Sequence, residues 1–244
     1  MTECERLIAN GTFTRDFWAG PCAPVVVAAV IFIWYAILVV AFWPWTSFDT
    51  INRYAIMAEE FADGNFKMAF HPRFGVFFQV LTGTMCWLTG ISGLVSCQLL
   101  STAGWCFAAI PLWHFARRLG GVGCAWWSVF LLFLVPDYLH YAGTGLRDGV
   151  KVFAFAAIAC GCVSSQIWLA VGIFVLVTLR ADGIVIGSVY VAAYAAYQLI
   201  FLRRFRALPL PVAALCLGLV CDSWMCYCYT GYFVPSVHSV RLFL

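Results

Sequence analysis

Charged residues are scarce in this chain: they make up 10% of its 244 residues, against 64% hydrophobic residues. A soluble domain carries about 25% charged residues, because ionic side chains cover its water-facing surface. The scarcity excludes a soluble globular enzyme, a disordered chain and a nucleic-acid-binding domain that depends on dense lysine and arginine. The formal net charge of +3 is small and carries no information about acidic partners. We therefore expect a polytopic membrane protein.

The chain also lacks the cysteine spacing of a zinc or thioredoxin-like site. None of its twelve cysteines forms a pair separated by two residues, and most lie inside apolar runs, where a free thiol behaves as a small hydrophobe. Cys226 and Cys228 are separated by one residue and remain a candidate disulfide or metal pair. No small-residue cleavage site follows the first apolar run, so we expect that run to stay as a membrane anchor.

The sequence contains several apolar segments that are long enough to span a membrane. A spanning helix needs about 20 mostly apolar residues, and aromatic side chains gather where it meets water. The predicted fold is an all-α membrane module of about seven transmembrane helices, with an amphipathic helix in the first outer loop and a juxtamembrane helix over 74–89. The predicted spans are 24–43, 90–115, 122–141, 150–162, 167–179, 184–202 and 210–229.

Two arginine clusters set the predicted orientation, because basic residues in short loops stay cytoplasmic. Arg117-Arg118 and Arg203-Arg204-Arg206 each sit at the end of a span. If both are cytoplasmic and 74–89 does not cross, residues 1–23 form a cytoplasmic tail. Residues 24–229 then form the transmembrane module, with its first outer loop at 44–73, and 230–244 form an outer-face tail. We expect a multi-pass protein of the plasma or inner membrane, with its active site on the outer face.

In this topology the acidic residues beyond the N-terminal tail share one membrane face. Solvated loops of no particular function would spread acids over both faces. An ionisable residue is expensive in lipid and is a functional candidate by default. Three of the four histidines map to the same face (His71, His140 and His238). The eight acids are Asp49, Glu59, Glu60, Asp63, Asp137, Asp148, Asp182 and Asp222.

Asp49 lies in the first turn of the amphipathic segment 47–63 and has two interpretations. Thr46 or Ser47 can cap this helix, and Gly64 supplies the left-handed residue that ends it. A carboxylate in the first turn is favoured by the helix dipole by roughly 0.3–1 kcal/mol, which is the purely structural interpretation. The functional interpretation is a carboxylate at the mouth of a membrane cavity, which acts as a general base or binds a cation.

Acidic and basic residues also begin two later spans. Arg147 and Asp148 are adjacent, with Lys151 one turn further on. The structural interpretation is a surface ion pair between Arg147 and Asp148, worth about 0–1 kcal/mol. In the functional interpretation, Asp148 faces a cavity while Arg147 or Lys151 binds phosphate. Arg180 and Asp182 repeat the pattern, which makes Arg180 a further candidate for substrate binding.

The order of these motifs resembles the GT-C superfamily of polytopic glycosyltransferases. The protein O-mannosyltransferase and aminoarabinose-transferase-like branch (glycosyltransferase family 39-like) is the most similar. The resemblance covers the chain from about residue 25 onward. The motifs that carry it are Phe48-Asp49, the segment from Phe61 through Gly64 to Phe66, His71-Pro72, Pro111-Leu112, Ala116 to Gly120, Leu146-Arg147-Asp148, Leu179 to Gly183, and Tyr229 to Pro235.

This resemblance implies transfer of a sugar from a polyprenyl-phosphate carrier to a glycan, lipid or protein acceptor at the outer face. The first-loop acid of the family maps to Asp49, as catalytic base or metal-linked carboxylate, and the second-loop acid maps to Asp148. His71, Arg73, Arg147 and Lys151 are then available to bind the lipid phosphate. A divalent cation is the one cofactor that the resemblance leaves open, and nucleic acid is not an expected partner.

The chain departs from that branch at two places. Members commonly have a second proline after His-Pro, and sometimes an acid just before it. This chain has Arg73 and Phe70 at these positions, which places a metal site in that loop in doubt. The chain also stops soon after Pro235, so we expect a truncated enzyme or a minimal core module. The alternatives are a transporter or flippase for a lipid-linked or small solute, and a non-catalytic relative. The charges at span ends argue against a transporter.

Overall fold

The computed structural model describes residues 17–42, 46–71, 75–135, 140–141, 143–203 and 205–236, apart from the side chains of Phe42 and Arg206. The secondary structure of these residues is helical, without strands, as predicted. Among them, four helical stretches are long and apolar enough to cross a membrane: 23–41, 93–134, 181–202 and 209–230. Length and composition therefore support a membrane protein, and the number of seven spans stays a prediction.

The helices follow the predicted segments closely. The predicted amphipathic segment 47–63 contains the π-helix η1 and helix α4, and 74–89 becomes α6. In chain order the elements are α3 (Ala23–Phe42), η1 (Thr50–Tyr54), α4 (Ala55–Ala62), α5 (Phe66–Ala69), α6 (Val76–Thr89), α7 (Gly93–Phe107), α8 (Ala109–Leu134), α10 (Asp148–Val163), α11 (Gln166–Leu179), α12 (Ala181–Tyr197), the π-helix η2 (Gln198–Leu202), the 3-10 helix η3 (Phe205–Ala207) and α13 (Pro209–Thr230).

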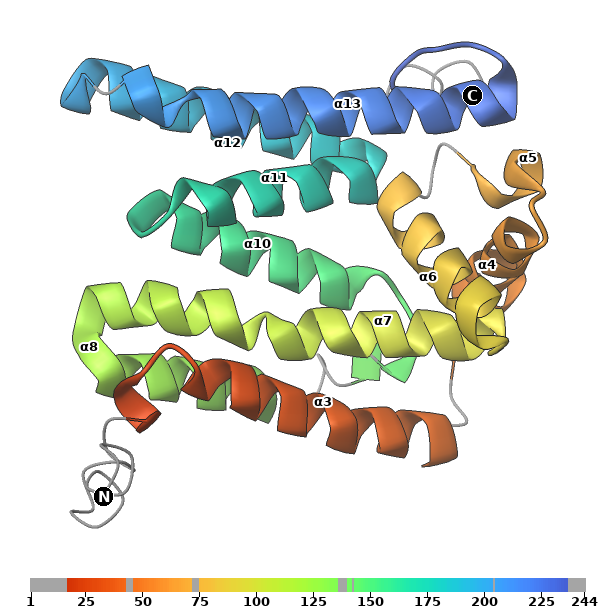
Figure 1. Cartoon of the computed structure of the whole chain (residues 1–244), viewed down its shortest axis with the longest axis horizontal. Coiled ribbons are helices and arrows are strands. Elements are labelled where there is room, and N and C mark those ends of the chain that lie inside the picture. The colour runs from red at the N-terminus through yellow and green to blue at the C-terminus, as the bar shows by residue number, and fades with distance from the viewer. Residues whose placement is uncertain are drawn as a thin grey trace, which may run out of the picture.

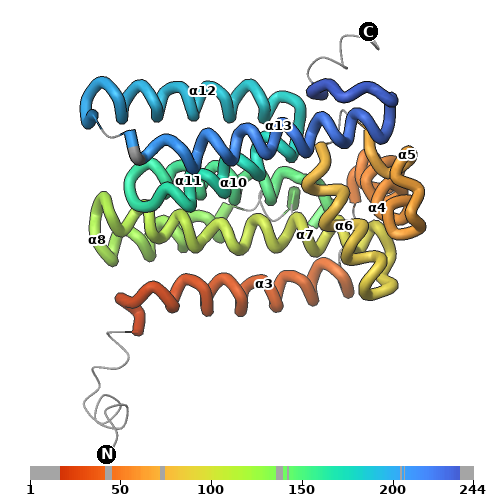
Figure 2. Tube along the Cα trace, turned by 45° about the horizontal axis from the view of Figure 1, so that its top comes forward, coloured from red at the N-terminus to blue at the C-terminus, as the bar shows by residue number. Residues whose placement is uncertain are grey.

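The long helices lie roughly side by side, and α4, α5 and α6 gather at one end of them (Figure 1). We call this the loop end; it also holds the starts of α7, α10 and α12. The opposite end holds the middle of α8, the α10–α11 turn at 164–165 and the chain around Arg203, and we call it the arginine end. Figure 2 shows the same separation from a second direction. The two ends therefore carry different segments of the chain.

Helix α8 reverses direction at the arginine end. Gly120 and Gly121 have non-helical backbone angles, and Gly121 has φ +78°, a conformation that favours glycine. Aromatic pairs confirm the hairpin: Trp113 packs on Trp126 with ring centroids 6.2 Å apart, and Trp105 on Phe133 at 5.0 Å. The predicted spans 90–115 and 122–141 thus correspond to α7 with the first half of α8, and to its second half.

The hydrophobic core has two main parts that meet at α10. One part lies between α3, α7, α8 and α10, around the buried side chains of Trp105 and Trp113. The other lies between α6, α10, α11 and α12, around Leu169, Ile173 and Leu176. By contrast, α3 and α12 expose many large apolar side chains, as lipid-facing helices do. This packing holds the loop-end segments against α10 and α11.

The first loop has the predicted local signals. The hydroxyl of Ser47 accepts a hydrogen bond from the backbone N–H of Thr50, at 3.0 Å, so Ser47 caps the helical turn. Gly64 ends the segment with φ +80°. Thr46 does not cap; its hydroxyl donates instead to the carbonyl of Thr144, at 3.4 Å. The loop is therefore tied to the segment that precedes α10.

Candidate functional site

Polar contacts bring three distant segments together at the loop end. The hydroxyl of Thr50 donates to the carbonyl of Thr144, at 2.7 Å. The side-chain amide of Gln98, in α7, donates to the carbonyl of Gly143, at 2.9 Å. Ser101, one turn later, donates to the carbonyl of Leu146. The turn before α10 is thereby fixed between the first loop and α7, which positions the residues that follow it.

Arg147 is the buried charge of this end, with 8% of its surface exposed. Its guanidinium lies over the ring of Tyr54, 5.6 Å from the ring centroid, and donates to the carbonyl of Leu179 at 3.4 Å. Burial lowers the pKa of Arg147, although arginine remains charged in proteins. The hypothesis of a surface ion pair between Arg147 and Asp148 is therefore wrong for Arg147. This side chain joins the first loop to the end of α11.

Tyr54 is a buried side chain that several charged residues influence. Its side chain is buried, with 3% exposure, and its ring packs edge-on against Phe78 at 5.6 Å. Burial raises the pKa of the Tyr54 hydroxyl, the negative charges of Asp49 and Asp148 raise it further, and the positive charges of Arg147 and Arg180 oppose them. The fold thus brings four predicted site residues close enough to influence one buried hydroxyl.

Asp148 and Lys151 line a pocket of about 410 Å³. The apolar part of its wall comes from α7 and α10, through Trp105, Val152 and Phe155, and Tyr141 and Gly149 complete it. Neither Asp148 nor Lys151 forms a side-chain ion pair or hydrogen bond within the part of the chain that the structure describes. The indole N–H of Trp105 is buried and likewise has no acceptor among those residues. The pocket therefore combines an apolar wall with both signs of charge.

Asp49 lies outside the lining of that pocket and forms an ion pair with Arg53, at 3.1 Å between Oδ1 and Nη1. Its side chain is half exposed. In the described ranges, no three residues of histidine, cysteine, aspartate or glutamate lie together in a way that would hold a metal ion. These residues do not fit a divalent cation at Asp49, and we derive no step through one. The ion pair with Arg53 fits the structural interpretation of Asp49 as a first-turn carboxylate, and its role as a base stays a prediction.

Two other predicted residues, Arg180 and His71, do not line the pocket, and a third is not described by the structure. Arg180 is half exposed and pairs with Asp182, at 3.0 Å. His71 packs against Tyr229 of α13, with 5.0 Å between ring centroids, so the structure places it beside α13. Arg73 lies outside the described residues, as do Asp137 and His238.

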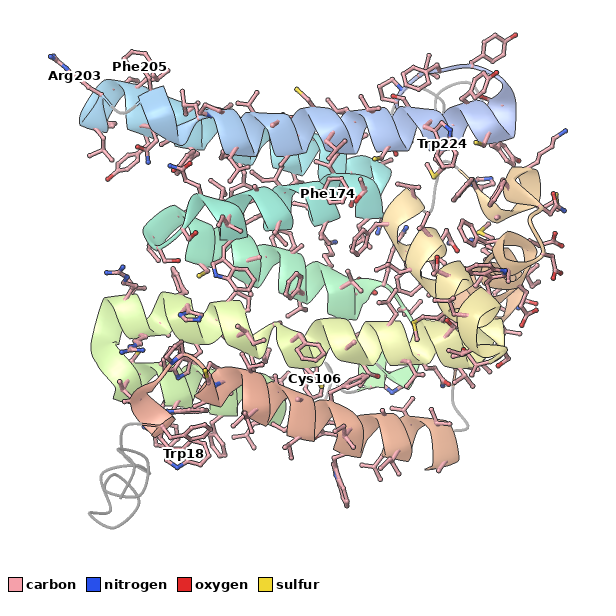
Figure 3. The ribbon with its side chains drawn as sticks, viewed as in Figure 1. Trp18, Cys106, Phe174, Arg203, Phe205 and Trp224 are labelled. Atoms are coloured by element: carbon pink, nitrogen blue, oxygen red, sulfur yellow. The ribbon has the colours of Figure 1, made fainter. Side chains whose placement is uncertain are left out.

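Asp222 has a structural contact at the end of α13. It is fully buried in α13, and its Oδ2 accepts a hydrogen bond from the backbone N–H of Ser236, at 2.7 Å. This contact holds the segment after α13 against the helix. Figure 3 shows the side chains of this region, with Trp224 labelled on the same helix. Asp222 is thus part of how α13 ends.

No family model, curated protein or solved structure matches the chain. The glycosyltransferase resemblance therefore rests on motif order alone. What the structure adds is local: it places Arg147 over Tyr54, whose pKa Asp49, Asp148 and Arg180 also affect, and it places Asp148 and Lys151 in the lining of one pocket.

Sequence reasoning missed Tyr54, Arg53 and Trp105. Tyr54 follows the apolar periodicity of the first loop, so its sequence position predicts a packing role. The spacing of Asp49 and Arg53, four residues apart on a helix, was the available signal for their ion pair. Trp105 lies inside an apolar run, and only the three-dimensional arrangement shows that it lines the pocket. Of these three residues, only Arg53 had a signal in the spacing of charges along the sequence.

Proposed function

We propose that this chain is a membrane glycosyltransferase that moves a sugar from a polyprenyl-phosphate-linked donor to an acceptor at the outer membrane face. The observation that carries the proposal is the pocket formed by Trp105, Asp148, Lys151 and Phe155 at the loop end. A lipid-linked sugar has an apolar tail, an anionic phosphate and a hydroxyl-rich head. The lining offers a surface for each part.

Donor binding follows from the charges of the lining. The ammonium group of Lys151 attracts the donor phosphate, and Val152 and Phe155 provide apolar contact for the first units of the tail. Asp148 accepts hydrogen bonds from sugar hydroxyls, as carboxylates do when they have no other partner. The volume of about 410 Å³ is within the range of roughly 300–1,000 Å³ that is usual for small-molecule sites. Arg147 is buried, so its role is to hold the start of α10 in place through its contacts with Tyr54 and Leu179.

The chemical step needs one base and one leaving group. The acceptor hydroxyl gives its proton to the carboxylate of Asp49, and its oxygen attacks the anomeric carbon of the donor. The bond from that carbon to the phosphate oxygen breaks, and its electron pair stays with polyprenyl phosphate. Lys151 stabilises the negative charge that the leaving phosphate gains. Attack opposite the leaving group inverts the configuration at the transferred carbon.

Asp49→Asn and Asp148→Asn test this proposal in the full chain, reconstituted in lipid with a polyprenyl-phosphate sugar. Loss of general-base catalysis lowers a rate by about 10²–10⁴-fold, so we expect Asp49→Asn to reduce kcat to that extent. Asp148→Asn is expected to raise KM for the donor as well, because it removes contacts with the sugar.

Asp63→Asn is the matched control, because Asp63 is an exposed carboxylate that follows α4 at the same end. It should retain the activity of the unmodified chain. Equal rates for Asp49→Asn and the unmodified chain would remove Asp49 from the mechanism. Equal rates for Asp148→Asn would show that the pocket is not the donor site.

A further inference from the structure

A second pocket lies at the arginine end, away from the proposed glycosyltransferase site. Its volume is about 540 Å³, and it is lined by His114, Arg117, Arg118 and Ser164. The first three come from α8 before its reversal, and Ser164 brings in the α10–α11 turn. We propose that this pocket binds the phosphate of an anionic phospholipid headgroup.

Among the described residues, no acidic side chain neutralises the positive charge of the pocket. Arg117 lies over the ring of Trp113, 4.8 Å from its centroid, and that is its only contact of this kind among the described residues. Arg118 has no ion pair, hydrogen bond or ring contact with them. The described acidic residues belong to the loop end or to the second half of α13. Within the described part of the chain, two guanidinium groups thus have no ionic partner and can bind phosphate, which arginine does with paired N–H donors.

Tryptophans place the pocket at headgroup depth. Trp18 packs on Trp126 at 5.5 Å, Trp126 packs on Trp113 at 6.2 Å, and Trp113 lies under Arg117. Figure 3 labels Trp18 and Arg203 at this same end of the molecule. Tryptophan gathers at the interface between the bilayer core and the headgroups. A phosphate held by Arg117 and Arg118 would therefore be at the level of lipid phosphates.

Apolar surface beside the pocket favours a lipid over free phosphate. The second half of α8 has a hollow of about 330 Å³, lined by Gly123, Trp126, Trp127 and Phe130. Its Trp126 contacts Trp113, which carries Arg117 on its ring. Acyl chains lying along this face would contact exposed Trp127 and Phe130. Basic pockets between membrane helices are known to select anionic headgroups.

Binding of radiolabelled phosphatidylglycerol to the detergent-solubilised full chain tests the proposal, with phosphatidylcholine as the zwitterionic comparison. A basic side chain near an anionic surface contributes about fivefold to affinity, so Arg118→Gln should weaken phosphatidylglycerol binding by about fivefold. The double change Arg117→Gln/Arg118→Gln should weaken it by about 25-fold. Arg118→Gln breaks no described contact, so we expect its thermal midpoint to remain unchanged.

Arg203→Gln is the matched control, because Arg203 is exposed at the same end and does not line the pocket. We expect it to change the affinity less than twofold. If Arg203→Gln weakens binding as much as Arg118→Gln, the attraction is a property of the whole surface and the pocket proposal is wrong. Phosphatidylcholine binding as tightly as phosphatidylglycerol would also overturn it. Displacement of the lipid by millimolar inorganic phosphate would assign the pocket to free phosphate instead.

Discussion

At the scale of single residues, the position of Arg147 decides how the loop end is built. Sequence places it beside Asp148 at the start of a helix, where a surface ion pair is the ordinary expectation. In the structure it is buried between Tyr54 and the carbonyl of Leu179. Arg147 therefore links η1 to the end of α11. Asp148, which lines the pocket, does not form an ion pair with Arg147.

Arg147→Gln should destabilise the protein by about 1–3 kcal/mol, because it removes a cation–π contact and a hydrogen bond from a charged donor. Arg180→Gln is the control. It removes a half-exposed ion pair, worth about 0–1 kcal/mol. Thermal denaturation in detergent measures both. Equal midpoints for the two variants would contradict the structural role of Arg147.

Tyr54 gives a prediction for alkaline pH. Its pKa in the folded protein lies above the ordinary 10.0, because burial and two carboxylates disfavour the phenolate. The folded state thus holds the proton more tightly than the unfolded state, so the stability from this group is complete below about pH 10 and is lost as pH rises beyond it. As the pH rises above about 10, Tyr54→Phe should therefore lose less stability than the unmodified chain. Parallel curves of thermal midpoint against pH would contradict this expectation.

At the scale of elements, glycines allow α7 and α10 to approach closely beside the pocket. A Cβ atom at Gly149 would lie 2.0 Å from the carbonyl oxygen of Ser101, and one at Gly104 would lie 2.6 Å from the backbone of Val150. The approach allows Ser101 to donate to the carbonyl of Leu146, just before α10. The position of Asp148 thus depends on backbone contact between two helices.

Gly149→Ala should separate these helices, at a cost of about 1–3 kcal/mol, and should lower sugar transfer because Gly149 lines the pocket. Gly123→Ala is the matched control, since a Cβ there would meet no atom within 4 Å. In a helix it should be neutral or stabilising by up to about 1 kcal/mol. Thermal midpoints and transfer rates of both variants check this. A Gly149→Ala protein with normal values of both would show that the contact is not needed.

Elements were more predictable than the contacts between them. Apolar periodicity and length identified α3, α11 and α13 within a residue or two, and Gly64 correctly marked the end of the first-loop segment. The pairing of Thr50 with Thr144 had no such signal, because it joins residues 94 positions apart through one hydroxyl. The same holds for Trp105, whose apolar neighbours in sequence conceal its place in the pocket wall. Local propensity determines helices, whereas packing determines the site.

At the scale of the whole molecule, charge is divided between two ends. The loop end has Asp49, Asp148, Lys151 and Arg180 near a partly apolar pocket, and the arginine end has Arg117 and Arg118 in another. Composition predicted a membrane protein, and the four apolar helices of spanning length among the described residues support that. The orientation in the membrane and the number of crossings stay predictions. The division of charge is the basis on which we propose sugar transfer at one end and lipid binding at the other.

Sugar transfer by the purified chain tests the central proposal most directly. The chain is reconstituted in a bilayer with a polyprenyl-phosphate sugar and a soluble hydroxyl acceptor, and the products are identified by mass spectrometry and by the anomeric NMR signals. The account predicts a glycosylated acceptor of inverted configuration, one polyprenyl phosphate released per transfer, and loss of both products in Asp49→Asn but not in Asp63→Asn. Transfer with retained configuration, or undiminished transfer by Asp49→Asn, would contradict it.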